Sequence, residues 1–131
     1  MFELINKLIR STMYGLRGLW YGFYTRKNMI TTLIVLFIYI FVMWYFDVDV
    51  IRAVIILFSC LMIIVAEVIN TAIEKVIDVL YPKYNRGLGM AKDISAGAVV
   101  VASITAAVVS AILLWEPFTS KIAEVFNKGI M

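Results

Sequence analysis

The chain has 131 residues, of which 63% are hydrophobic and 16% are charged, with a formal net charge of +3. A soluble domain carries about 45–50% apolar and about 25% charged residues, so the surplus of apolar side chains indicates a protein that faces lipid. The absence of histidine excludes histidine-ligated zinc and histidine-activated nucleophiles. A catalytic base must therefore be a carboxylate, a lysine or a tyrosine, and any bound metal is expected to be an oxygen-ligated cation such as Mg²⁺.

Residues 2–24 predict a basic amphipathic helix. Hydrophobic side chains recur there at steps of three or four residues, and a second stripe contains Lys7, Arg10, Tyr14, Arg17 and Tyr21. A helix of this kind lies in the plane of the membrane surface. Two interpretations stay open: the helix is a plain interfacial anchor, or Lys7, Arg10 and Tyr14 also bind phosphate groups.

Three further ranges predict membrane-spanning helices. Residues 29–46 and 94–115 carry no charge and would be about 27 Å and about 33 Å long as helices, close to the thickness of the hydrocarbon core. The helical pattern of residues 51–80 predicts a helix of about 45 Å, which must leave the membrane at one end. We take 91–115 as the whole third span and 116–131 as a tail without an assigned role.

The distribution of positive charge predicts the orientation of the chain. Nine of the 12 Lys and Arg residues fall on the same side as the N-terminus, and three fall on the opposite side. Positively charged loops stay in the cytoplasm, so we expect a multi-pass protein of the prokaryotic inner membrane whose N-terminus and loop at 81–93 face the cytoplasm. Pro82, Gly87 and Gly89 predict turns and flexibility in that loop.

One stripe of the predicted helix at 51–80 is polar. Glu67, Asn70, Glu74 and Asp78 follow one another at steps of three or four residues and project within an arc of about 80°. Ionisable groups near lipid are costly and indicate a functional site by default. The alternative is an interhelical clamp, because polar side chains also fasten membrane helices to one another.

The start of the third predicted span carries Lys92 and Asp93, which are either an ordinary interfacial pair or part of the same site. Together with the stripe, they provide a base near the lipid boundary (Glu67), oxygen ligands for a metal (Glu74 and Asp78) and a cation for phosphate (Lys92). These groups suit phosphoryl transfer, in which positioning and charge neutralisation carry most of the catalysis. The predicted reaction moves a phosphate from Mg·ATP to a lipid hydroxyl. The alternatives are a small ion-coupled transporter and a non-catalytic or weakened membrane scaffold.

Small residues recur along the third predicted span and allow close helix packing: Ala91, Ser95, Ala98, Ala102, Thr105 and Ala106. Three spans are few for enclosing a polar site, so we expect a homo-oligomer with its sites at subunit contacts. The other expected partners are the membrane, ATP and a lipid alcohol, and no nucleic acid.

The run AEVINTAIEKVIDVL, followed by AKDISAGAV, closely resembles the small prokaryotic diacylglycerol kinase family, which includes undecaprenol kinases. The resemblance covers nearly the whole chain, since RGLWYGFY is similar to the family's surface helix and FDVDVIRAVIIL to its turn into the second span. It implies an all-α integral-membrane fold with three spans per subunit, an amphipathic N-terminal helix and a domain-swapped homotrimer. It also implies a lipid kinase without a P-loop, so the missing P-loop motif does not count against activity.

The resemblance further implies roles for individual residues. Glu67 is the general base, and Glu67 and Asn70 meet the lipid substrate. Glu74 is a ligand of Mg²⁺. With the candidates on the surface helix added, the expected set that binds ATP and its phosphates is Lys7, Arg10, Tyr14, Glu74, Asp78, Lys92 and Asp93.

One position departs from the family pattern. The family usually carries a second metal-binding glutamate between the surface helix and the first span, whereas the matching position here is Arg26. Arginine has no lone pair to offer Mg²⁺. Either metal binding is weaker, or Arg26 contacts nucleotide phosphate, or activity is lost. The acceptor also stays open: NTAIE and AGAV resemble undecaprenol kinases, which we slightly favour, and FDVDV resembles diacylglycerol kinases.

Overall fold

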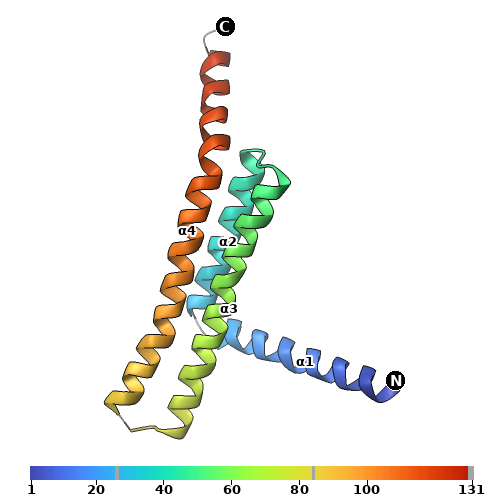
Figure 1. Cartoon of the computed structure of the whole chain (residues 1–131), viewed down its shortest axis with the longest axis vertical. Helices are drawn as coiled ribbons and strands as arrows, with labels where there is room; N and C mark the ends of the chain where they lie inside the picture. The colour runs from blue at the N-terminus through green and yellow to red at the C-terminus, as the bar shows by residue number, and fades with distance from the viewer. Residues whose placement is uncertain (26, 84, 130–131) are drawn as a thin grey trace.

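The residues that the structure describes form four helices: α1 (Phe2–Thr25), α2 (Lys27–Tyr45), α3 (Val50–Leu80) and α4 (Arg86–Gly129). The computed structural model describes residues 1–25, 27–83 and 85–129, and no strand occurs in them. α3 packs against both α2 and α4, and α1 projects away from this bundle (Figure 1). The predicted all-α class is therefore confirmed.

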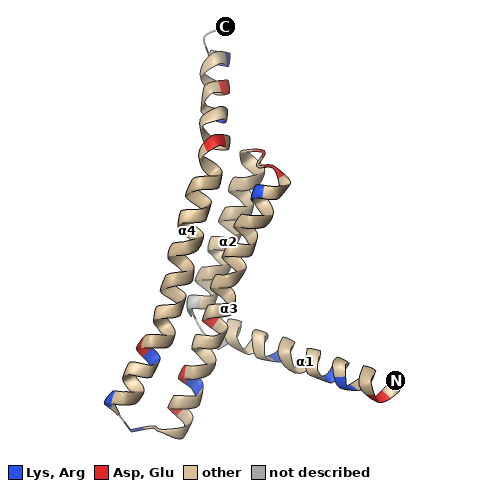
Figure 2. Cartoon of the chain, viewed as in Figure 1, with Lys and Arg blue, Asp and Glu red and all other residues tan. Residues whose placement is uncertain are grey.

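Two connections define the ends of the bundle. A tight turn (residues 46–49) joins α2 to α3, and a loop (residues 81–85) joins α3 to α4. We call these the turn end and the loop end. In the turn, Asp47 adopts a φ of 51°, a left-handed conformation that Asp tolerates better than most residues. Charged residues gather toward both ends and along α1, while the stretches of α3 and α4 between them carry none (Figure 2).

Both long helices begin at a capping side chain. At the start of α3, Oδ1 of Asp49 accepts hydrogen bonds from the backbone amides of Ile51 and of the residue after it, at 3.1 and 3.2 Å. At the start of α4, Oδ1 of Asn85 accepts from the amides of Gly87 and of the residue after it, at 2.9 and 3.3 Å. Each cap satisfies amide groups that the first helical turn leaves without intrahelical partners.

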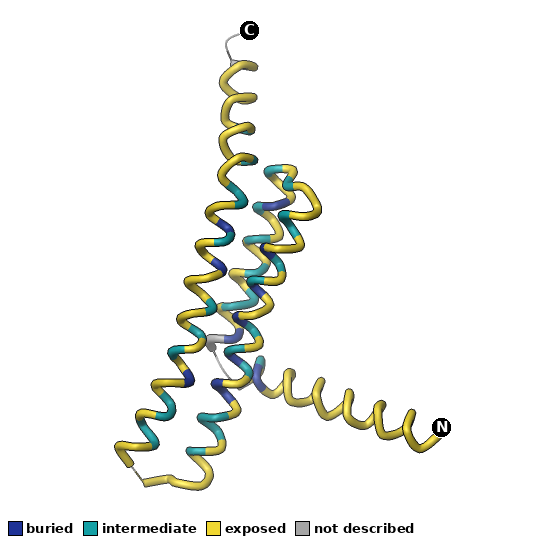
Figure 3. Tube along the Cα trace, viewed as in Figure 1, coloured by how far each residue is buried: buried dark blue, intermediate teal, exposed yellow. Residues whose placement is uncertain are grey.

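Most apolar residues of the helices are exposed, as the burial of each residue along the chain shows (Figure 3). α3 and α4 are each long and apolar enough to cross a membrane. Yet in the most apolar 18-residue stretch of each helix, only 28% (α3) and 11% (α4) is buried. α1 and α2 are long and apolar enough to cross a membrane only when taken together, with a bend of 95° between Phe2–Tyr24 and Met29–Tyr45. The buried core is small and centres on Met43, Ile56 and Cys60. The outward apolar surface is suited to lipid or to further subunits.

The start of α4 differs from the expectation drawn from the sequence. The helix begins at Arg86, so Gly87 and Gly89 lie inside its first turns and not in a flexible loop. The Asn85 cap starts the helix ahead of both glycines, and neither glycine has a positive φ. The prediction of turns at these two glycines was therefore wrong, because a capping side chain offset the low helix propensity of glycine.

The C-terminal segment expected to be a tail is also helical. α4 continues through Pro117 as far as Gly129. The ring of Phe118 lies 5.5 Å from the ring of Phe46, and Nζ of Lys121 lies 3.2 Å from Oδ2 of Asp47. These contacts with the turn end favour the helical extension.

Candidate active site

A polar stripe on α3 runs from the buried part of the bundle toward the loop end. Glu67, Asn70 and Thr71 are each 7% exposed, Glu74 is half-buried and Asp78 is exposed. Nδ2 of Asn70 donates a hydrogen bond to Oε1 of Glu74 at 3.2 Å, as side chains four residues apart on a helix can. The stripe therefore runs from buried to exposed positions along a single helix face.

The first turns of α4 bring two further side chains to this stripe. Lys92 forms an ion pair with the carboxylate of Asp78. Oγ of Ser95 donates a hydrogen bond to Oδ1 of Asn70 at 2.6 Å, and Ser95 is 8% exposed. Candidates from two predicted helices thus meet in one group. Asp93 is exposed, and within the described residues no hydrogen bond or ion pair joins it to the others.

Ser95 is the residue that sequence reasoning missed. The sequence placed it in a series of small residues and assigned it only to helix packing. A usable signal was its position three residues after Lys92, which puts both side chains on one face of the helix. Its partner on α3 could not be read from the sequence, because the contact depends on how two helices pack.

The basic residues of α1 stay apart from the stripe within one chain. Lys7, Arg10 and Tyr14 are exposed and line a hollow of about 550 Å³ on α1 itself. α1 runs away from the bundle toward the N-terminus (Figure 1). Its C-terminal part contacts α3, where Nζ of Lys75 lies 5.8 Å from the ring centroid of Tyr21 in a cation–π contact. One chain alone therefore does not assemble the whole phosphate-binding set predicted from the sequence.

The donor set around Glu74 fits a metal that arrives with its nucleotide. No group of three acidic or cysteine side chains in the described part of the chain is placed to hold a metal ion. Mg²⁺ usually binds one or two carboxylates together with substrate phosphates and waters, without a cage made only of protein. Glu74 can supply such a carboxylate. Arg26, which stands where the family pattern has a glutamate, lies outside the described residues, so its role stays a prediction.

An apolar groove adjoins the stripe. It has a volume of about 560 Å³, lies between α3 and α4, and has a lining that is almost entirely hydrophobic. Its lining includes Ile73 and Ser95 near the loop end, and Phe58 and Thr105 in the charge-free part of the bundle. A groove of this shape and polarity is suited to an alkyl chain whose polar head lies near the stripe.

Comparison with known proteins places the chain among its relatives. The family model described as prokaryotic diacylglycerol kinase matches residues 13–114. Diacylglycerol kinase of Escherichia coli (strain K12) is 29% identical over 113 residues, which is 86% of this chain and 93% of the relative. Diacylglycerol kinase of Synechocystis sp. is 44% identical over 69 residues, which is 52% of this chain and 39% of that relative.

Fold and comparisons together define the class: an integral-membrane phosphotransferase with an alcohol as acceptor. The chain belongs to the prokaryotic diacylglycerol kinase family, as its motifs predicted. The residues of the polar stripe, Lys92 and Ser95 all fall inside the matched range, whereas Lys7 and Arg10 precede it. Membership of an enzyme family leaves the transporter interpretation without support.

Proposed function

We propose that this protein transfers the γ-phosphate of Mg·ATP to the hydroxyl of a membrane lipid. The observation that carries the proposal is the adjacency of the apolar groove to the polar stripe. An alkyl chain in the groove would bring its head group toward Asn70 and Ser95. The exposed end of the stripe, with Asp78 and Lys92, is open to a water-borne nucleotide.

In this proposal, Glu67 is the general base that accepts the proton of the lipid hydroxyl. Its burial keeps competing water away from the reacting oxygen, and a positioned base accelerates proton transfer by about 10²–10⁴-fold. Asn70, one turn further along α3, contacts the lipid head group on one side and Glu74 on the other.

The nucleotide end of the site would use carboxylates and cations in different roles. Glu74 would hold Mg²⁺ together with the nucleotide phosphates, and the metal would neutralise the charge on those phosphates. Lys92 is the cation for phosphate, with Asp78 as its partner on α3 and Asp93 next to it in the chain. These assignments follow from residue chemistry and the family pattern.

We further propose a homotrimer with the loop end in the cytoplasm. The excess of Lys and Arg on the side of the N-terminus supports the orientation. The separation of Lys7, Arg10 and Tyr14 from the stripe supports an oligomer, because α1 of one subunit would then complete the site of another. Each subunit would form a single domain with a surface helix (2–24) and three spans.

The identity of the acceptor is a separate question within this proposal. The named relatives are diacylglycerol kinases. The NTAIE and AGAV segments support undecaprenol, which we still favour slightly. Both lipids present a hydroxyl at the membrane interface, so both suit the same chemistry and differ in the alkyl groups that must fit the groove.

A phosphate-transfer assay tests the function directly. Purified protein in mixed micelles with Mg²⁺ and γ-labelled ATP would be offered diacylglycerol, undecaprenol and a shorter polyprenol in parallel. We expect label in the lipid fraction that depends on both Mg²⁺ and acceptor. No incorporation into any of these lipids would falsify the proposed function, and a single labelled lipid would identify the acceptor class.

A further inference from the structure

The hydroxyl of Ser95 makes two close polar contacts within the site. Its Oγ lies 2.6 Å from Oδ1 of Asn70 and 2.8 Å from the backbone oxygen of Lys92. Ser95 and Asn70 are both more than nine-tenths buried. A hydroxyl has one proton to donate, and both neighbouring oxygens are acceptors. The shorter contact, to Asn70, is the one that joins the two helices.

Glu74 and Ser95 together fix the orientation of the Asn70 amide: the carboxylate of Glu74 can only accept, and the hydroxyl of Ser95 holds the opposite side of the amide. With Oδ1 of Asn70 accepting from Ser95, the amide nitrogen Nδ2 faces Glu74 and donates to its Oε1 at 3.2 Å. The reversed amide would turn Oδ1 toward a carboxylate that can only accept, which is unfavourable. Ser95, Asn70 and Glu74 thus form a directed chain of hydrogen bonds from α4 to the candidate metal ligand.

A second link lies further along the same helix pair. Lys92, one turn before Ser95 on α4, pairs with Asp78, two turns beyond Asn70 on α3. Glu74 lies between the two links on α3. The register of α4 against α3 is therefore held on both sides of Glu74, with the buried link made by Ser95.

We propose that Ser95 is a positioning residue for phosphoryl transfer: through Asn70 it holds the carboxylate of Glu74 in the orientation that receives Mg·ATP. This inference rests on the proposed lipid kinase function. Ser95 itself does not contact the reacting atoms. Its loss should weaken binding of Mg·ATP more than it slows turnover at saturating nucleotide.

The chain offers a rescue variant and a matched control on the same helix. Ser95→Ala removes the hydroxyl with no penalty in helix propensity. Ser95→Thr keeps it, and the adjoining groove leaves room for the added methyl group. Ser110→Ala is the control, because Ser110 is 2% exposed and its hydroxyl has no hydrogen-bond partner among the described residues.

The experiment measures steady-state kinetics and metal binding on the same preparations. Full titrations of ATP, Mg²⁺ and lipid give the kinetic constants. Binding of Mn²⁺ in the presence of ATP and without lipid, followed by electron paramagnetic resonance, gives a readout that needs no turnover. We expect Ser95→Ala to raise the KM for Mg·ATP and the Kd for Mn²⁺ by about three- to tenfold, the range that loss of one hydrogen bond produces. Ser95→Thr should restore the wild-type KM for Mg·ATP and Kd for Mn²⁺, and Ser110→Ala should match the wild type in both.

Two outcomes would overturn the inference, and a third would refute the proposed function while supporting the contact between Ser95, Asn70 and Glu74. If Ser95→Ala and the active wild type share the same KM and Mn²⁺ affinity, Ser95 does not position Glu74. If Ser95→Ala and Ser95→Thr lose kcat equally with KM unchanged, the role is packing. A wild type without activity toward any lipid, but with Mn²⁺ binding that weakens in Ser95→Ala, refutes the proposed kinase function and leaves the metal-positioning contact in place.

Discussion

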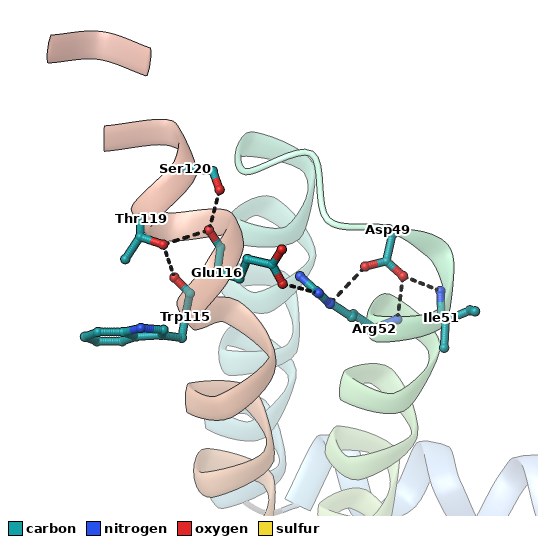
Figure 4. A network of polar contacts seen from close by, with 7 residues as sticks. All are labelled: Asp49, Ile51, Arg52, Trp115, Glu116, Thr119 and Ser120. Atoms are coloured by element: carbon teal, nitrogen blue, oxygen red, sulfur yellow. Dashed lines mark hydrogen bonds and ion pairs between the residues drawn. The ribbon is translucent and has the colours of Figure 1, made fainter. Parts of the chain in front are cut away.

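At the turn end of the bundle, Arg52 lies between Asp49 and Glu116 and pairs with both (Figure 4). Lys121 pairs with Asp47 at the same end. At the loop end, Glu67 and Asn70 are each only 7% exposed, and hydrogen bonds run from Ser95 through Asn70 to Glu74. Both ends use charged and polar side chains to join α3 to its neighbours.

The two ends differ in how far their polar side chains are buried, and therefore in the free energy that burying them costs. The turn-end carboxylates are exposed, and exposed ion pairs contribute little because water screens them and side-chain entropy opposes them. Buried polar groups are costly unless they are hydrogen-bonded, so their presence near lipid requires a stronger reason than helix fastening. Glu116 and Lys121 also lie beyond the range that the family model matches, residues 13–114, while the loop-end group lies within it. This difference is consistent with the proposal that the chemistry belongs to the loop end, and we expect the turn end to serve only to fasten helices.

The largest expected effect comes from removing the base. Glu67→Gln keeps the shape of the side chain but cannot accept a proton, so kcat should fall by about 10²–10⁴-fold. Glu116→Gln is the matched control at the turn end and should leave kcat unchanged. Phosphate transfer to lipid, measured at saturating Mg·ATP, checks both variants. If the Glu67→Gln protein keeps more than about a tenth of the wild-type rate, Glu67 is not the general base.

The next effect concerns the metal. Glu74→Gln should raise the Mg²⁺ concentration needed for half-maximal activity by on the order of 10–100-fold, since loss of even an outer-shell partner costs that much in other metal sites. Glu124→Gln at the turn end should not change it. A Mg²⁺ titration at fixed ATP measures the requirement. Equal requirements for the two variants would mean that Glu74 does not hold the metal.

A smaller effect is expected at the position that departs from the family pattern. If Arg26 replaces a lost metal ligand, Arg26→Glu should lower the Mg²⁺ requirement and raise the rate, which is the outcome we expect. If Arg26 instead binds nucleotide phosphate, the same change should raise the KM for ATP. A Mg²⁺ titration and an ATP titration at saturating Mg²⁺ separate these results. Unchanged kinetics in both would place Arg26 away from the site.

The smallest effect is expected at the turn end. Arg52→Gln removes the pairs with Asp49 and Glu116, but the side chain of Arg52 is 31% exposed and the side chains of its partners are 53% and 71% exposed. The loss of stability should be at most about 1 kcal/mol, with kcat and KM unchanged. Thermal unfolding in detergent, at low and at high salt, measures it. A fall in activity comparable to that of Glu74→Gln would show that the two ends do not have separate roles.

Much of the site was predictable because helical periodicity is local. Because of their spacing, the four polar side chains of the stripe fall on one face of any helix that contains them, and the structure has them on α3: Glu67, Asn70, Glu74 and Asp78. The link between Lys92 and Asp78 and the link between Ser95 and Asn70 were not predictable. Each joins residues 14 or 25 positions apart in the chain, and the contact exists only once α3 and α4 have packed in one register.

The helical extension at the C-terminus is a second feature that the sequence did not predict. Residues 116–131 were expected to be a tail, yet α4 continues through Pro117 to Gly129. Around the proline, the carbonyl of Glu116 accepts hydrogen bonds from the hydroxyls of Thr119 and Ser120 (Figure 4). Contacts of the extension with the turn between α2 and α3 add to this, and no local pattern encodes them.

The sequence by itself determined that this protein is helical, embedded in a membrane and polar along one face of α3, because hydropathy and the period of 3.6 residues act over short stretches of chain. Only the tertiary structure decided which side chains of α4 meet that face and which carboxylates pair with which cations. Those choices depend on the rotation and register of packed helices, to which residues throughout the interface contribute.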